Sequence, residues 1–117
     1  ERDAYNTGLF RALRQVHLMR AAVSRDRSDY ELAIEAATQA LALYPQDPPS
    51  LVSLADTYAE AGRVLGDPAM TGKAIEHYQA ALDLDDQRIE WERLRRFRPS
   101  EREAIQRKIE ALRDSLN

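Results

Sequence analysis

The chain has 117 residues, of which 44% are hydrophobic and 32% are charged, and it contains no cysteine. This composition is too apolar for a disordered tail and too charged for a membrane segment, and it excludes disulfides and thiolate metal sites. The net charge of −3 gives no global field that would attract nucleic acid. The length fits a single domain, residues 1–117. Because the first residue is glutamate and not methionine, we expect a fragment of a longer protein.

Hydrophobic periodicity predicts a first helix over about residues 3–23, where apolar side chains such as Leu9, Leu13 and Val16 recur every three or four positions. A polar run follows, and Ser28 or Asp29 is expected to cap the next helix. That second helix is predicted from about Tyr30 to Leu43. The proline-rich segment after it ends the helix, because proline cannot continue a helix interior.

A third helix is predicted to start near Pro49 and to end at Gly62 or Gly66. The dipeptide Asp67–Pro68 combines a capping residue with a proline suited to a first helical turn, so it predicts the start of a fourth helix. The apolar spacing of this fourth helix continues to about residues 85–86.

A shorter helix is predicted within residues 88–98, and Pro99 separates it from the last one. Ser100 and Glu103 have the spacing of a capping box. In this motif the serine side chain accepts a hydrogen bond from the backbone N–H of the glutamate, and the glutamate side chain accepts one from the backbone N–H of the serine. Glu103 and Arg107 are four positions apart and are expected to pair on the helix surface. No segment has the alternating pattern of a strand.

Internal self-similarity is the most informative feature of the sequence. Ala33 aligns with Ala74, and Ala40 aligns with Ala81. Small residues at two points on one face allow a neighbouring helix to approach closely. Stacked helical hairpins need such contacts, because a lone hairpin cannot cover its own apolar face.

This pattern resembles the tetratricopeptide repeat (TPR) family over about residues 30–86. The residues that carry the resemblance are Ala33, Ala37, Ala40, Pro45, Leu51, Leu54, Ala55, Tyr58, Ala74, Tyr78 and Ala81. The sequence departs from the family in its spacing, since Ala33 to Ala74 is 74 − 33 = 41 residues against about 34 in a standard unit. Arg95 stands where a third unit needs a small residue, so the array is expected to end there, with residues 100–116 as a capping helix.

The resemblance implies an all-α fold: an antiparallel helical-hairpin, right-handed solenoid of about five to six helices. It also implies a scaffold module that binds a protein or peptide in a concave groove lined by the first helix of each hairpin. In the best-aligned first helix the groove positions fall on Val52, Ser53, Asp56 and Glu60. TPR domains that grip a carboxylate have Lys and Asn at two of these positions, where this chain has Val52 and Ser53.

The sequence contains no enzyme signature. His17 and His77 lie on different predicted helices, without the spacing of a metal site. Acidic pairs such as residues 85–86 lie at helix ends, and the glycines lack a phosphate-binding spacing. We therefore expect no catalytic residue, no metal and no cofactor.

Two alternatives remain open from the sequence. The segment Arg88–Arg98 carries several arginines around Trp91 and Phe97, which is typical of an anion, lipid-headgroup or nucleic-acid contact. The run Trp91–Leu94 followed by Pro99–Arg102 is similar to the soluble TPR tails of bacterial O-antigen polymerases and ligases, whose parent chain is membrane-anchored. This fragment itself has no candidate membrane span, and its sequence favours neither a cytoplasmic nor a periplasmic location.

Overall fold

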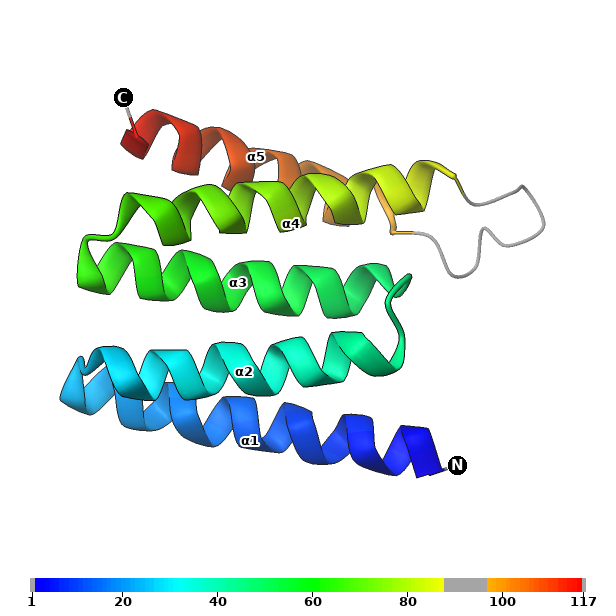
Figure 1. The fold of residues 1–117 in the computed structure, drawn as a ribbon. Coiled ribbons are helices and arrows are strands. Elements are labelled where there is room, and N and C mark those ends of the chain that lie inside the picture. Colours follow the sequence, from blue (N-terminus) through cyan, green and yellow to red (C-terminus); the bar gives the residue numbers. More distant parts are fainter. Residues whose placement is uncertain (1, 88–96, 117) are drawn as a thin grey trace.

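The computed structural model describes residues 2–87 and 97–116, and the regular elements within these ranges are all α-helices (Figure 1). They are α1 (Arg2–Ser24), α2 (Arg27–Leu43), α3 (Pro48–Leu65), α4 (Pro68–Asp86) and α5 (Pro99–Leu116). The prediction of an all-α chain is confirmed. The short helix predicted within residues 88–98 falls almost entirely outside the described residues.

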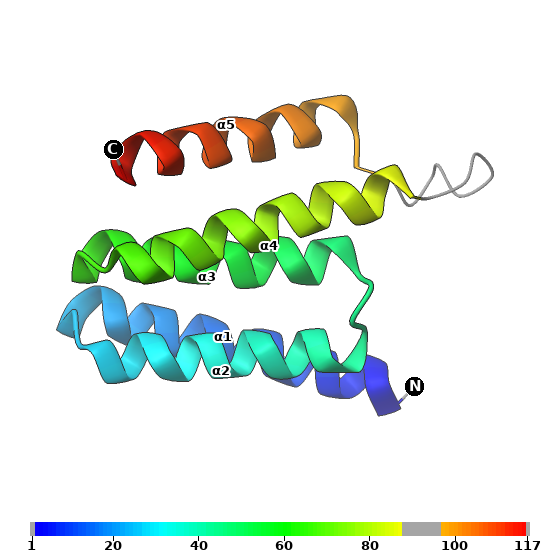
Figure 2. The ribbon, with the colours of Figure 1, turned by 45° about the horizontal axis from the view of Figure 1, so that its top comes forward.

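Neighbouring helices run in opposite directions, and each packs mainly on the next helix along the chain (Figure 1). Helices α1 and α2 form one hairpin, and α3 and α4 form a second one beside it. Helix α5 lies against α4 on the far side of this second hairpin (Figure 2). The result is a flat stack with principal extents of 45 × 40 × 19 Å.

Aspartates set the starts of the middle helices. Asp26, Asp47 and Asp67 are the N-caps of α2, α3 and α4, and each carboxylate accepts a hydrogen bond from a backbone N–H in the first turn. The prediction that Ser28 or Asp29 caps α2 is therefore wrong. Both residues lie inside the first turn, because Asp26 already supplies the acceptor that the helix end needs.

The start of α5 also differs from the prediction. The helix begins at Pro99, and the Glu101 carboxylate accepts a hydrogen bond from the backbone N–H of Arg98 at 2.7 Å. Because Pro99 occupies the first helical position, the contact between a glutamate and the backbone N–H of the capping residue joins Glu101 to Arg98. It lies two residues earlier than in the predicted Ser100–Glu103 box. The predicted surface pair does form, with Arg107 Nη2 3.3 Å from Glu103 Oε2.

Of the apolar side chains that predicted α1, Phe10 and Leu18 are partly buried and the others are not. Leu9, Leu13 and Val16 are exposed, whereas Ala21 is fully buried and Leu18 packs beside it. Helix α1 packs mainly on α2, so only one stripe of α1 is covered. Periodicity identified a helix here, but α1 carries apolar residues on two faces, and periodicity does not show which face is buried.

Small residues bring the helices together, as the repeat alignment requires. Ala33, Ala40, Ala74 and Ala81 are all buried. Gly62 goes further: a Cβ added to it would lie 2.5 Å from Thr71 Oγ1 and 2.9 Å from the Thr71 backbone nitrogen. Of the two glycines predicted to end α3, only Gly66 does so; it takes the left-handed conformation (φ 62°), while Gly62 is a packing residue within the helix.

Helix α5 is attached to α4 by a buried carboxylate. Asp85 is fully buried, and its carboxylate accepts hydrogen bonds from the Phe97 backbone N–H at 2.8 Å and from Arg102 Nη1 at 2.6 Å. The same guanidinium reaches Asp86 Oδ1 at 2.9 Å. One turn further on, apolar side chains of α5 enter the core.

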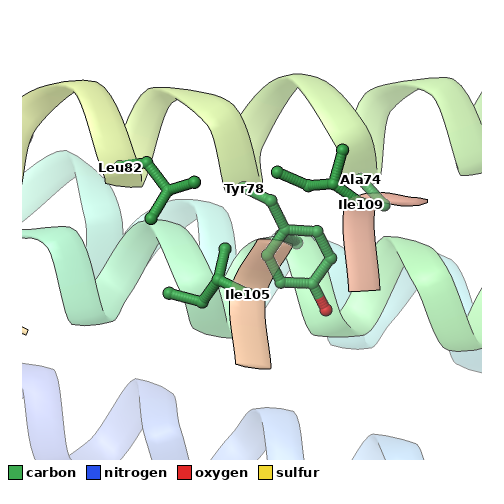
Figure 3. Close-up of a cluster of buried hydrophobic side chains, with 6 residues drawn as sticks. Ala74, Tyr78, Leu82, Ile105 and Ile109 are labelled. Carbon is green, nitrogen blue, oxygen red and sulfur yellow. The ribbon is translucent and has the colours of Figure 1, made fainter. Parts of the chain in front are cut away.

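This core cluster joins three helices. Ile105 and Ile109 of α5 lie against Tyr78 and Leu82 of α4 (Figure 3), and Ala55 of α3 belongs to the same cluster. Burial of two isoleucine side chains contributes roughly 1.5–3 kcal/mol each. Helix α5 is therefore part of the domain and not a detached tail.

The close approach at Gly62 gives a first prediction. Gly62→Ala should lower the free energy of unfolding by about 1–3 kcal/mol, because the new methyl group overlaps backbone that cannot move freely. Gly72→Ala is the matched control: its added Cβ has open space in the interior of α4, so it should stabilise by about 0.5–1 kcal/mol. Urea unfolding measures both, and equal effects of the two substitutions would contradict the close packing.

The buried carboxylate gives a second prediction. Asp85→Asn should destabilise the fold by about 3–5 kcal/mol, since it leaves buried donors without a charged acceptor. Asp86→Asn, at a side chain that is 57% exposed, should cost less than about 1 kcal/mol. Thermal unfolding followed by circular dichroism compares the two variants, and similar losses would show that burial of Asp85 does not matter.

Candidate functional site

Helix α3 presents one continuous polar stripe between α1 and α5. Its members recur at spacings of three and four and therefore share a face; they are Ser53, Asp56, Glu60 and Arg63. Two hollows open along this stripe. The α3–α5 hollow lies toward the end of α3, and the α1–α3 hollow lies at its beginning.

The α3–α5 hollow has a volume of about 720 Å³. Its apolar lining comes from Ala59 of α3 and from Ala111, Leu112 and Leu116 of α5. Leu112 packs partly on the core cluster, whereas Leu116 remains 43% exposed. The hollow thus forms where α5 continues past its contact with α4.

A hydrogen-bonded trio from three helices lines one part of this hollow. The Tyr78 hydroxyl donates to Asp56 Oδ1, and Lys108 Nζ lies 3.1 Å from the same oxygen. Burial raises the pKa of Tyr78 far above its usual range, and the hydrogen bond to Asp56 raises that pKa further. The phenol therefore stays protonated and donates to Asp56 at every physiological pH.

The other acids of the hollow are also paired. Glu60 Oε1 lies 2.6 Å from Arg63 Nη2 on the surface of α3. Asp67 Oδ2 lies 3.1 Å from Arg27 Nη1 of α2. The hydrogen bond from Arg27 is the main reason why the pKa of Asp67 falls below its ordinary value of 3.8, and the backbone N–H of Ala69 adds to that effect. Within the described residues, each acid of this hollow therefore has a cationic partner.

The α1–α3 hollow has a volume of about 440 Å³ and a different character. Its lining residues are Phe10, Arg11, Arg14, Gln15, Ala37, Ala40, Pro49, Ser50 and Ser53. The Arg14 guanidinium donates to Thr57 Oγ1 through Nη1 at 3.2 Å. Its Nε is buried and has no hydrogen-bond partner within the described part of the chain.

The structure divides the four predicted groove residues. Asp56 and Glu60 line the α3–α5 hollow, and Ser53 lines the α1–α3 hollow. Val52 is half-buried against the core cluster of α3, α4 and α5. The four residues therefore face three different surroundings.

Sequence reasoning missed the part of the site that α5 supplies. Lys108 and Ala111 line the α3–α5 hollow, but the last helix was interpreted only as a cap. It also missed Arg11 and Arg14. The available signal was the absence of any acid from Ala4 to Arg25, which leaves the arginines of that segment without a partner on their own helix.

Other candidates hold no comparable arrangement. His77 stacks on Tyr58 at 5.5 Å, and its Nδ1 lies 2.7 Å from the Lys73 carbonyl oxygen. Over residues 2–87 and 97–116, no three His, Asp or Glu side chains gather as metal ligands, and no helix is long and apolar enough to cross a bilayer. The arginine-rich segment proposed as an anion contact, Arg88–Arg98, lies outside the described residues except for its last two.

Comparison with known proteins adds no relative: no protein-family model, no curated protein and no solved structure matches the chain.

The Asp67–Arg27 pair gives a third prediction. Because the folded-state pKa of Asp67 is lowered, its stabilising effect is present above the unfolded-state pKa and is lost as pH falls through the folded-state pKa. Asp67→Asn keeps a capping side chain but removes the charge. We expect this variant to be less stable than the wild type at pH 7 and to lose most of that difference at an acid pH below the folded-state pKa of Asp67.

Urea unfolding at both pH values measures that difference. The matched background is Arg27→Gln, in which the Asp67→Asn effect at pH 7 should shrink because the charge partner is gone. An effect of unchanged size in that background would show that capping alone, and not the pair with Arg27, sets the behaviour of Asp67.

Proposed function

We propose that this chain is a protein-binding module of TPR-like architecture that holds a short segment of a partner in the α3–α5 hollow. It acts as a scaffold and not as an enzyme. The observation that carries the proposal is an open, apolar-lined hollow of about 720 Å³ between α3 and α5. This volume is within the range of about 300–1,000 Å³ that is usual for ligand pockets.

The architecture supports this proposal. Two antiparallel hairpins stack side by side, and α5 extends the stack. Contacts between alternate helices come from side chains: Arg14 of α1 reaches Thr57 of α3, and Lys108 of α5 reaches Asp56 of α3. Helices α1, α3 and α5 thus line one side together, as the first helices of stacked hairpins do in repeat proteins that bind along a concave surface.

The chemistry of the hollow favours an apolar side chain flanked by polar backbone. Ala59, Ala111 and Leu112 offer surface that gains free energy when a ligand covers it. The charged groups beside them already have partners, so they do not have to be desolvated without compensation. A partner segment with one or two aliphatic or aromatic residues fits this combination.

The fourth prediction tests this hollow directly. Peptides selected from a random phage-displayed library on the purified chain should lose at least about tenfold in affinity to Ala111→Arg, since the long side chain fills the hollow. Ala42→Arg is the matched control, because Ala42 is also an exposed helical alanine but lies on α2 outside both hollows. Isothermal titration calorimetry measures the affinities, and circular dichroism checks that both variants remain helical.

Two results would count against the proposal. One is a set of selected peptides that bind Ala111→Arg and the wild type equally well. The other is a library selection that enriches no peptide above the background given by the Ala111→Arg chain.

A further inference from the structure

The α1–α3 hollow collects cations without an opposing acid. Arg11 and Arg14 come from α1, while Gln15 and Ser53 add polar groups that can donate hydrogen bonds. No aspartate or glutamate belongs to the described lining. Asp47, which precedes this part of α3, is already committed to capping, because its carboxylate accepts from the Ser50 backbone N–H at 3.2 Å and from Ser50 Oγ at 2.6 Å.

Arg14 is the group that most needs a further acceptor. A guanidinium has five N–H donors, and in Arg14 the described contact is Nη1 to Thr57 Oγ1 at 3.2 Å. Buried donors that lack an acceptor cost free energy. The Nε of Arg14 is such a donor within the described residues. An incoming carboxylate could accept from a guanidinium through two oxygens at once.

The two hollows are on one face of α3 and are separated along its axis. Ser53 borders the α1–α3 hollow, and Glu60 and Arg63 border the α3–α5 hollow. The lining residues of the two hollows differ by about ten positions along α3, or roughly 15 Å at about 1.5 Å per residue. An extended peptide covers that distance with about five residues.

We propose that the α1–α3 hollow binds the carboxylate of an acidic residue in the same partner segment whose apolar residue enters the α3–α5 hollow. This rests on the proposed function and specifies its ligand: a short segment, acidic toward the start of α3 and apolar toward its end. The apolar part of the lining, from Phe10, Ala37, Ala40 and Pro49, favours an acidic side chain with its methylene groups over inorganic phosphate.

The experiment uses the full chain and a minimal acidic probe. The dipeptide Ac-Glu-Glu-NH2 is titrated into 15N-labelled protein, with Ac-Gln-Gln-NH2 as the uncharged isostere and inorganic phosphate as a third arm. The side-chain Nε–Hε resonance of Arg14 is the reporter. We expect it to shift with the glutamate dipeptide, to shift at least threefold less with the glutamine dipeptide, and to respond more weakly to phosphate.

Variants at exposed arginines of α1 provide the second readout. Arg11→Gln should weaken binding of the glutamate dipeptide about three- to fivefold, as expected for a partly exposed charge pair. Arg20→Gln is the matched control, because it lies on the same helix and is exposed but does not line the hollow. It should leave the affinity unchanged within about 1.5-fold if the site is local, since charge effects at a distance are screened by salt.

Three results would overturn the inference: no shift at Arg14, equal shifts with the two dipeptides, or tighter binding of phosphate than of the glutamate dipeptide. Equal losses in Arg11→Gln and Arg20→Gln would also overturn it, because they would indicate diffuse attraction to a basic helix. These outcomes are separate from the Ala111→Arg test. The dipeptide carries no apolar residue for the α3–α5 hollow, so either site can fail while the other holds.

Discussion

A single buried carboxylate determines where the last helix lies. Asp85 has no exposed surface, and an unpaired charge in such a place would cost several kcal/mol. The chain satisfies it from the segment that enters α5, through the Phe97 N–H and the Arg102 guanidinium. Once these bonds form, Ile105 and Ile109 are placed on α4 and Lys108 is placed beside Asp56. The α3–α5 hollow therefore depends on a group at the opposite end of α4.

The hollow is open because close packing stops partway along α5. At the other end of the α3–α4 hairpin, Gly62 lets the two helices meet without an intervening side chain, and Asp67 closes their turn by capping α4 and pairing with Arg27. Between the Asp85 contacts at one end of α4 and the α3–α4 turn at the other, α5 covers α4 with its isoleucines but leaves Leu116 partly in solvent. The free apolar surface is thus a result of the packing, since both its walls are held by contacts elsewhere.

Much of this fold could be predicted from the sequence because its signals are local. Helix positions followed from periodicity and proline, and the Asp67–Pro68 start of α4 followed from capping chemistry. The second half of the site could not be predicted in the same way. Asp56 is on the predicted face, but its neighbours Lys108 and Tyr78 are 52 and 22 residues away in the chain. Tyr78 meets Asp56 through the packing of α3 on α4, and Lys108 meets it because α5 is held on α4. Contacts of that range depend on tertiary packing, which periodicity does not encode.

The charge of the chain shows how an average can conceal a site. A net charge of −3 argues against long-range attraction of nucleic acid. It says nothing of a short stretch in which cations stand alone, and α1 is such a stretch from Ala4 onward. On α3, by contrast, Asp56 and Glu60 are paired with cations. Paired charges interact weakly with a third group, whereas an unpaired guanidinium interacts strongly. In the proposed function, the two ends of the same stripe therefore bind different parts of the ligand.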